Sequence, residues 1–279
     1  MNDDGPPFRA QRTSYGRAVL VVSLTATSLR IGRLAEVVQS LLEQTLQPER
    51  ILIWLSEEPF LFDRGVPRDQ IPTNLRALAD AADTPVEVRY TENTGPFRKI
   101  MPTIENFRGQ LSSLIVVTAD DDTCYPPRWL ESLYAGYRRE RCAVAFRARR
   151  ILYEGGRPLP YRTWPKVDGY DELLRHTLMT TAKDGHLLTP DMLAKPFFSD
   201  DFKRLCPSRC DAWVGAALLA RKTPTLKLSL VRIAKVGGHT LPPIPEFRAA
   251  EDAGVALAAH NRDLNDGFIA GTFRHYGLV

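Results

Sequence analysis

Short apolar runs alternate with stretches of helical periodicity along the first half of the chain. Runs rich in apolar and β-branched residues predict strands at 18–25, 51–55, 86–90, 114–119 and 143–148. Between them, apolar residues recur at helical spacing and predict helices from 34 to about 47, over 75–82 and over 128–140. This alternation with short links predicts an α/β fold, with a mostly parallel, Rossmann-like sheet covered by helices on both faces.

The second half has a weaker pattern. It predicts a long loop at 153–170, a mixed region at 173–193 and a short helix capped at 199–201. An apolar helix at 212–220, a strand at 226–233, an irregular stretch at 237–245 and a last helix at 261–276 follow. No repeat or separate domain boundary is visible. We therefore expect one domain over 18–279, behind a flexible N-terminal arm at 1–17, with the second half elaborating the same sheet.

Three consecutive carboxylates, Asp120, Asp121 and Asp122, follow the apolar run that ends at 119. Like charges this close repel one another, so their ionised forms favour a partner of opposite sign. Oxygen-only ligands at the end of a buried strand suit a hard cation such as Mg²⁺ or Mn²⁺, and Mg²⁺ commonly shares its shell with substrate phosphates. A metal and a nucleotide diphosphate are therefore predicted here; the plainer alternative is a solvated acidic loop.

Ligands of such sheets bind beyond the carboxyl ends of the strands. Thr25, Ser56, Thr91 and Asp120 should lie on that one edge. Lys99 follows the Gly95-Pro96 turn at the expected start of a helix, where a cation and free N–H groups would suit a phosphate. A solvent-facing lysine is the alternative.

Composition limits the possible partners. The chain has 279 residues, 44% of them apolar and 25% charged, and its net charge of +4 comes without a nucleic-acid-binding module, so nucleic acid is not an expected partner. Its four cysteines lack zinc-site spacing and resemble reduced cytosolic thiols. Neither a signal peptide nor a transmembrane run is apparent, so we expect a cytoplasmic protein, with peripheral association at the inner membrane face as a further possibility.

Several stretches together resemble a family-2-type glycosyltransferase of the GT-A fold, in particular a bacterial subgroup associated with cell-surface polysaccharide. They occur in the family's order from about 19 to 276. The matching residues are Val21 to Thr25, Gly95-Pro96 with Lys99 and Pro102, Thr118 to Asp122 with Tyr125-Pro126 and Trp129-Leu130, Asp184-Gly185 before Leu188 and Pro190, Cys206-Pro207 with Asp211 and Trp213, and Asn261 with Asn265-Asp266.

The resemblance implies a nucleotide-sugar donor, most simply a UDP-sugar, and a glycan or lipid-linked acceptor. It implies that Thr25 and Ser56 lie near the base and ribose. The diphosphate would bind through Mn²⁺ or Mg²⁺ at Asp122, with Asp120 and Asp121 nearby and Lys99 assisting. The halves 18–150 and 151–279 would then hold donor and acceptor.

The resemblance also implies an inverting displacement, for which a carboxylate must deprotonate the acceptor hydroxyl. Asp211, at the start of the apolar helix, is the candidate base, and a plain helix N-cap is its alternative role. Asp184, Gly185 and Trp213 are the candidate acceptor residues.

Two departures from the family pattern keep other functions open. Cys210 stands where the subgroup usually has an acidic residue, and 181–185 replaces a glycine-rich acceptor loop. A non-catalytic GT-A-like protein that binds a nucleotide or sugar is therefore one alternative. An aspartyl phosphotransferase fits Asp120-x-Asp122 less well, because Cys124 stands where Thr or Val is expected and the motif lies in mid-chain.

Overall fold

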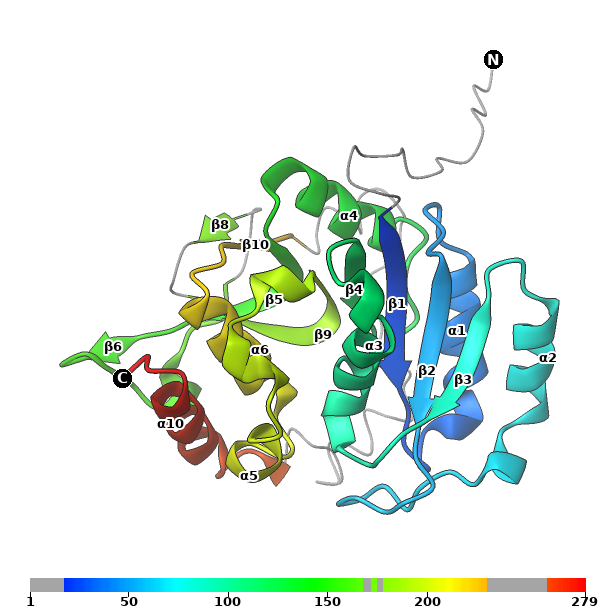
Figure 1. The fold of residues 1–279 in the computed structure, drawn as a ribbon, viewed down its shortest axis with the longest axis horizontal. Coiled ribbons are helices and arrows are strands. Elements are labelled where there is room, and N and C mark those ends of the chain that lie inside the picture. Colours follow the sequence, from blue (N-terminus) through cyan, green and yellow to red (C-terminus); the bar gives the residue numbers. More distant parts are fainter. Residues whose placement is uncertain (1–17, 168–171, 175–177, 230–259) are drawn as a thin grey trace.

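The computed structural model describes residues 18–167, 172–174, 178–229 and 260–279. An eight-stranded sheet has the order β3-β2-β1-β4-β9-β5-β10-β8 (Figure 1). Its strands are β1 (Val19–Thr25), β2 (Arg50–Leu55), β3 (Val86–Tyr90), β4 (Leu114–Thr118), β5 (Ala143–Arg150), β8 (Glu172–Leu174), β9 (Leu178–Leu188) and β10 (Thr225–Lys227). The expected arm at 1–17, the irregular stretch at 237–245 and the end of the strand expected at 226–233 lie outside the described residues.

The sheet is mostly parallel, as the sequence predicts. β3, β2, β1 and β4 are joined by parallel pairings, and β5 and β10 run in the same direction beyond them. Among the described strands of this sheet, only β9 and β8 run the opposite way. The strands and helices expected in the first half are confirmed, within a few residues at their ends. Parallel strands place their carboxyl ends at one edge, so the segments after β1, β2, β3 and β4 meet there.

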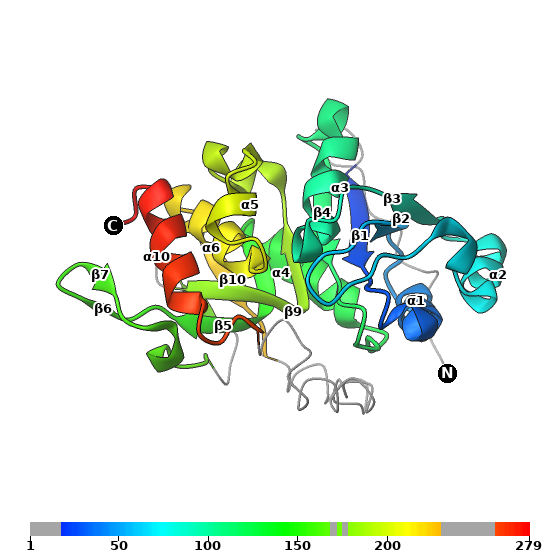
Figure 2. The same ribbon diagram turned by 90° about the horizontal axis from the view of Figure 1, so that it is seen from below.

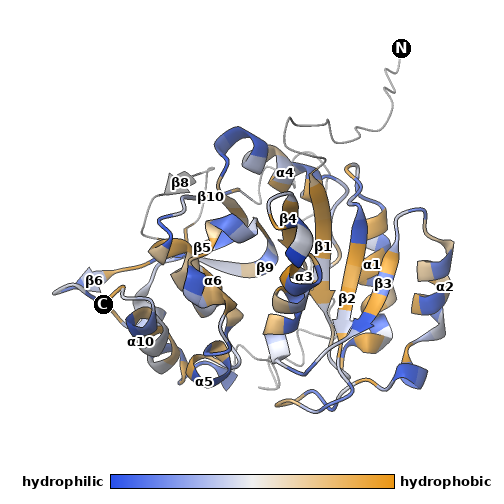
Figure 3. Cartoon of the chain, in the orientation of Figure 1, coloured by the Kyte–Doolittle hydropathy of each residue, from blue (hydrophilic) through white to orange (hydrophobic). Residues whose placement is uncertain are grey.

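Helices cover both faces of the sheet (Figure 2). They are α1 (Leu34–Leu42), α2 (Thr73–Ala81), α3 (Met101–Asn106), α4 (Trp129–Glu140), α5 (Phe202–Leu205), α6 (Cys210–Ala220) and α10 (Asn265–His275). Successive residues of β1 contribute to two apolar cores, because side chains alternate between the faces of a strand. Val22 belongs to the core with α1 and α4, whereas Val21 belongs to the core with α3 and α6. Figure 3 shows in orange the apolar residues along these strands and helices.

The antiparallel strand β9 lies in the middle of the sheet, between β4 and β5, and was not expected. The sequence suggested a mixed region over 173–193 because polar residues interrupt its apolar pattern. The described part of the loop expected at 153–170, residues 153–167, contains a hairpin of β6 (Tyr153–Glu154) and β7 (Arg157–Pro158) that was not predicted.

Near its end, β9 has an irregular backbone. Asp184 and Gly185 both have positive φ, at 69° and 108°, and the pairing with β5 shifts register between Ala145 and Arg147. A register shift of this kind, as in a β-bulge, changes the direction of the side chains next to it. The segment expected to form an acceptor loop is therefore the interior of a strand.

Lys99 lies at the start of a helix, as expected. It ends a 3-10 helix over Gly95–Lys99 and directly precedes Ile100, the N-cap of α3.

Gly185→Ala should destabilise the fold by about 1–3 kcal/mol. A Cβ here would lie 2.6 Å from the Trp129 ring, at a φ that alanine rarely adopts. Urea unfolding measures the change. Gly109→Ala is the control, because a Cβ there meets nothing within 4 Å; its effect should stay within about 0.5 kcal/mol. Equal effects of the two substitutions would contradict the packing argument.

Candidate functional site

The three carboxylates lie directly after β4, at the edge where β1 and β2 also end. Asp121 and Asp122 are each only 7% exposed, although both are acidic. The backbone N–H of Asp120 donates to the Tyr125 hydroxyl at 2.7 Å, which fixes the turn. The loop therefore holds its carboxylates in place rather than leaving them in solvent.

One arginine bridges two of these carboxylates. Arg30 Nη1 lies 2.8 Å from Asp121 Oδ1 and 2.9 Å from Asp122 Oδ2. Burial alone would lower the pKa of Arg30, but Asp121 and Asp122 outweigh burial and raise it. Arg30 lies in the turn after β1, so this contact ties the β1 loop to the β4 loop. The sequence alone did not indicate Arg30, because no motif distinguishes it there.

The negative charge of Asp122 remains energetically unfavourable although Arg30 pairs with it. Burial, followed by repulsion from Asp120 and Asp121, raises the pKa of Asp122 to about 6, while Arg30 and Lys183 oppose the shift. A divalent cation would remove this penalty more completely than a monovalent side chain does.

Lys99 is the partner of the third carboxylate. Its Nζ lies 2.7 Å from Asp120 Oδ1, and the lysine is only 8% exposed. Burial is the largest single influence and lowers its pKa, but the charges of Asp120 and Asp211 and the hydrogen bond to Asp120 act in the opposite direction, and the pKa is raised overall. The solvent-facing alternative for Lys99 is therefore wrong. Lys99 is a buried cation near both Asp120 and Asp211.

Asp211 lies in the first turn of α6, where the sequence placed it. Its Oδ1 accepts a hydrogen bond from the backbone N–H of Ala182 in β9 at 2.9 Å. The carboxylate is therefore oriented by the neighbouring strand, and no side-chain cap of α6 is formed by it. The neighbouring Cys210 is buried, and burial, then Asp211, raises the pKa of its thiol to about 12, so the thiol stays neutral.

The expected acceptor residues make structural contacts. Asp184 pairs with Arg147 through its carboxylate, and its carbonyl accepts the Trp129 indole N–H at 2.7 Å. Burial raises the pKa of Asp184, and Arg147 opposes that shift. Trp213 is fully buried and stacks on His275 at 5.3 Å, so its ring supports the packing of α6 on α10 and has no exposed surface for an acceptor.

Thr25 and Ser56 lie at the expected edge and bond to nearby backbone. Thr25 Oγ1 donates to the Trp54 carbonyl at 2.7 Å, and Ser56 Oγ accepts the Glu58 N–H at 3.2 Å. Both residues help to shape this edge of the sheet. Contact of either with a nucleotide stays a prediction.

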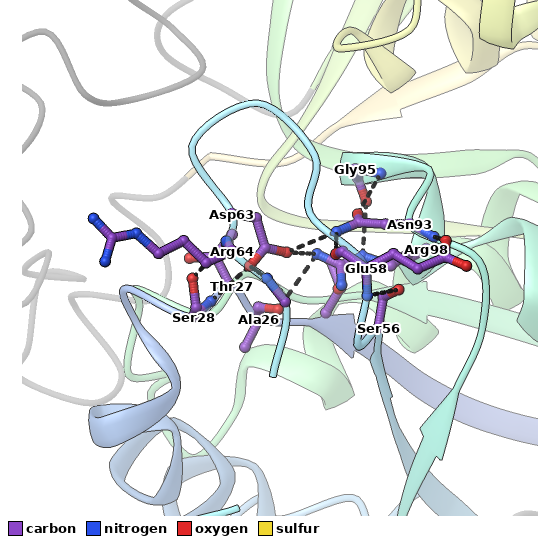
Figure 4. A network of polar contacts seen from close by, with 12 residues as sticks. Ala26, Thr27, Ser28, Ser56, Glu58, Asp63, Arg64, Asn93, Gly95 and Arg98 are labelled. Atoms are coloured by element: carbon purple, nitrogen blue, oxygen red, sulfur yellow. Dashed lines mark hydrogen bonds and ion pairs between the residues drawn. The ribbon is translucent and has the colours of Figure 1, made fainter. Parts of the chain in front are cut away.

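A polar network that the sequence did not indicate joins the loops beside them (Figure 4). At its centre, Asp63 accepts hydrogen bonds from Ser28 N–H at 2.8 Å, Asn93 Nδ2 at 3.1 Å and Arg98 Nη2 at 2.7 Å. Asp63 and Arg98 are 4% and 1% exposed. The loops after β1, β2 and β3 are therefore held together around a buried ion pair.

A half-open cavity of about 220 Å³ lies next to this network. Its lining includes Phe60, Asn93 and Phe202. Asp120, Asp121 and Asp122 are not among the residues that line this cavity.

The residues fit a hard cation in their chemistry but are not assembled around one point. Among the described residues, no three His, Cys, Asp or Glu side chains form a metal-binding group. Asp120 faces Lys99, whereas Asp121 and Asp122 face Arg30. Because the donors are all carboxylate oxygens at one loop, one or two of them could serve a Mg²⁺ or Mn²⁺ ion that completes its shell with phosphate.

His186 is a further residue that the sequence did not indicate. It lies in β9 opposite Thr118 and Ala145, it is 3% exposed, and its Nε2 has no hydrogen-bond partner among the described residues. Burial, and then the charge of Lys99, lower the pKa of His186 to about 4. The imidazole is therefore neutral near the buried lysine.

His186 should make stability depend on pH. Between pH 6.5 and 4 the unfolded histidine binds a proton that the folded one does not, so the stability present above pH 6.5 falls as pH drops through this window. We expect His186→Gln to remove about 3 kcal/mol of this acid destabilisation, measured by urea unfolding at several pH values. His260→Gln is the control. A wild-type pH slope retained in His186→Gln would contradict the assignment.

Comparison with known proteins identifies the family. The chain matches the model of glycosyl transferase family 2 over residues 26–201, which is more than half its length. No curated protein matches it. No helix among the described residues is long and apolar enough to cross a bilayer.

Three solved structures are similar at low identity. TarS 1–349 of S. aureus is 11% identical with a TM-score of 0.41, over 76% of this chain and 61% of that chain. A CMP:2-keto-3-deoxy-manno-octonic acid synthetase complexed with CTP is 8% identical with a TM-score of 0.42, over 77% and 90%. The 4-diphosphocytidyl-2C-methyl-D-erythritol synthase of Anaerococcus prevotii DSM 20548 is 13% identical with a TM-score of 0.35, over 65% and 74%. The chain thus spans about 61% of the TarS chain.

The mostly parallel sheet with helices on both faces confirms the GT-A-like fold class. With the family match over residues 26–201, the chain belongs to glycosyl transferase family 2.

Proposed function

We propose that the chain transfers a sugar from a nucleotide-diphosphate donor to a hydroxyl of a glycan or glycolipid acceptor, in a metal-dependent, inverting reaction. The observation that carries this proposal is the placement of Lys99 near both Asp120 and Asp211. Lys99 pairs with Asp120 of the loop after β4, and the charge of Asp211 in α6 also acts on Lys99, so this lysine links the two segments electrostatically. Family membership supports sugar transfer; the donor, the metal and the acceptor are our proposal.

The donor diphosphate would lie over the β4 loop. Asp122 would be the principal ligand of Mn²⁺ or Mg²⁺, with Asp120 and Asp121 nearby. Once bound, the ion would neutralise the diphosphate and the charge of the leaving group. The base and ribose, most simply those of a UDP-sugar, would lie near Thr25 and Ser56, at the edge formed by β1 and β2.

Lys99 would act on the same diphosphate by its charge. A cation fixed in place before the reaction stabilises charge as it develops, without reorganising at that moment. Lys99 meets this condition because Asp120 holds its ammonium at 2.7 Å and little solvent reaches it.

Asp211 would be the general base. As the acceptor oxygen forms its bond to the anomeric carbon, the bond from that carbon to the diphosphate breaks, and the hydroxyl proton passes to the Asp211 carboxylate. The Ala182 N–H fixes one carboxylate oxygen, which leaves the second available for the proton. The reaction then inverts the anomeric centre, because attack and departure occur on opposite faces.

The acceptor would bind beside β9 and α6, near Asp211. Asp184, Gly185 and Trp213 are all buried, so they would shape an acceptor site by holding β9 and α6 in place rather than by direct contact. A bacterial surface polysaccharide or its lipid-linked precursor is the acceptor class that we propose. With a lipid-linked acceptor, the chain would work at the cytoplasmic face of the membrane in peripheral association with it.

A non-catalytic protein that binds a nucleotide or sugar is the second candidate. It is favoured by Cys210, a neutral buried thiol that cannot serve as a second base at pH 7. An aspartyl phosphotransferase has less support, because Lys99 already holds the carboxylate of Asp120, its would-be nucleophile. Turnover of a sugar nucleotide separates the first proposal from both alternatives.

Asp211→Asn should lower the transfer rate by about a hundredfold or more, the scale of losing a general base. Asparagine can still accept the Ala182 N–H through its Oδ1, so stability and donor binding should stay close to wild type. The measurement is transfer or hydrolysis of the bound sugar nucleotide, with donor affinity measured by calorimetry.

Asp200→Asn is the matched control, because it removes a carboxylate that is 82% exposed. Its rate should equal that of the wild type. A full rate in Asp211→Asn would return Asp211 to a structural role.

A further inference from the structure

Arg30 supplies positive charge to the acidic loop from a position that a metal ion could take over. A single guanidinium nitrogen lies 2.8 Å from Asp121 Oδ1 and 2.9 Å from Asp122 Oδ2. The two carboxylates come from one turn, whereas Arg30 comes from the loop that follows β1. The contact therefore joins two loops through charge, across 91 and 92 residues of sequence.

The charges at this loop do not favour a divalent ion while Arg30 stays in place. Three ionised carboxylates face two side-chain cations, Arg30 and Lys99, which leaves one formal negative charge among these five groups. Lys183 lies close enough to lower the pKa of Asp122 as well. A divalent ion added to this set would make it positive, so the ion gains most if Arg30 leaves.

Arg30 can leave more easily than Lys99. Its side chain is 21% exposed, whereas that of Lys99 is 10% exposed. Arginine has a long side chain with several rotatable bonds, and a planar guanidinium binds phosphate oxygens in pairs, which an ammonium does not. A guanidinium released beside a metal-bound diphosphate therefore has a new partner close by.

We propose that Arg30 is a built-in counter-cation that a divalent metal displaces from Asp121 and Asp122, after which its guanidinium binds the donor diphosphate. This inference rests on the proposed metal-dependent function. It makes Arg30 a positioning residue for the metal-free acidic loop and a donor-binding residue for the loaded one.

Removing Arg30 should strengthen metal binding but weaken donor binding, so its two roles can be tested separately. Arg30→Gln should bind Mn²⁺ about tenfold more tightly than wild type in the absence of nucleotide, because the competitor is gone. With Mn²⁺ saturating, the same variant should bind UDP about tenfold more weakly, because a phosphate partner is gone; GDP replaces UDP if the wild type binds only GDP. Titration calorimetry measures both affinities. A residue that only stabilised the loop would weaken both when removed.

Arg33→Gln is the control for the loss of one positive charge. Arg33 lies three residues away and pairs with Glu36 on the surface. It should change both affinities by less than about twofold, since exposed charges are screened. Arg30→Lys serves if Arg30→Gln does not fold; it should show the same two signs with smaller changes, because an ammonium bridges carboxylates and phosphates less well.

The other possible results contradict either the inference on Arg30 or the metal-dependent function itself. Unchanged or weaker Mn²⁺ binding in Arg30→Gln would overturn the displacement, and tighter Mn²⁺ binding with unchanged UDP affinity would overturn the role of Arg30 in donor binding. If neither wild type nor variant binds Mn²⁺ with or without UDP, the metal-dependent function itself is wrong. Equal Mn²⁺ binding by all proteins would remove only the inference on Arg30.

Discussion

Repulsion among Asp120, Asp121 and Asp122 is the constraint on which the rest of the site depends. Three adjacent carboxylates at the end of a buried strand are stable only if cations face them. Lys99 faces the first, and Arg30 faces the other two. These contacts draw in the segment after β3 and the loop after β1, and Lys99 in turn lies near Asp211 of α6. The pairing of charges thereby sets the positions of the loops that would surround a donor and its acceptor.

The buried pair of Asp63 and Arg98 fixes the neighbouring part of this edge. A buried pair of this kind adds little net stability, but removing one partner leaves an uncompensated charge in the core. Here its value is geometric: Asp63 also accepts hydrogen bonds from the loop after β1 and from Asn93 after β3. One part of the edge is thus fixed by a buried pair, while Arg30, at the acidic loop, is the more exposed cation.

The sequence predicted those parts of the fold that depend on local patterns. Apolar runs and helical periodicity located β1, β4, α1 and α4, and their parallel order implied the edge on which Asp120 lies. Strand β9 was missed because its pairing with β4 and β5 overrides a polar local sequence that includes Lys183 and Asp184. Arg30 and His186 were missed for a related reason: their surroundings come from segments distant in the chain, and no spacing rule shows them. Burial likewise removed Trp213 from the set of side chains that could touch an acceptor.

Binding of a nucleotide diphosphate at this edge of the sheet, through a metal at Asp122, is the central claim. The most direct test is a thermal-shift screen of UDP-, GDP-, CMP- and dTDP-sugars, with and without Mn²⁺, on the wild type and on Asp122→Ala. A ligand that binds only the folded state raises its apparent stability by mass action. We predict that at least one of the diphosphate donors (UDP-, GDP- or dTDP-sugar) stabilises the wild type, that it does so only with Mn²⁺, and that Asp122→Ala loses this shift while remaining folded. No shift with any donor, or a full Mn²⁺-dependent shift in Asp122→Ala, would contradict the claim.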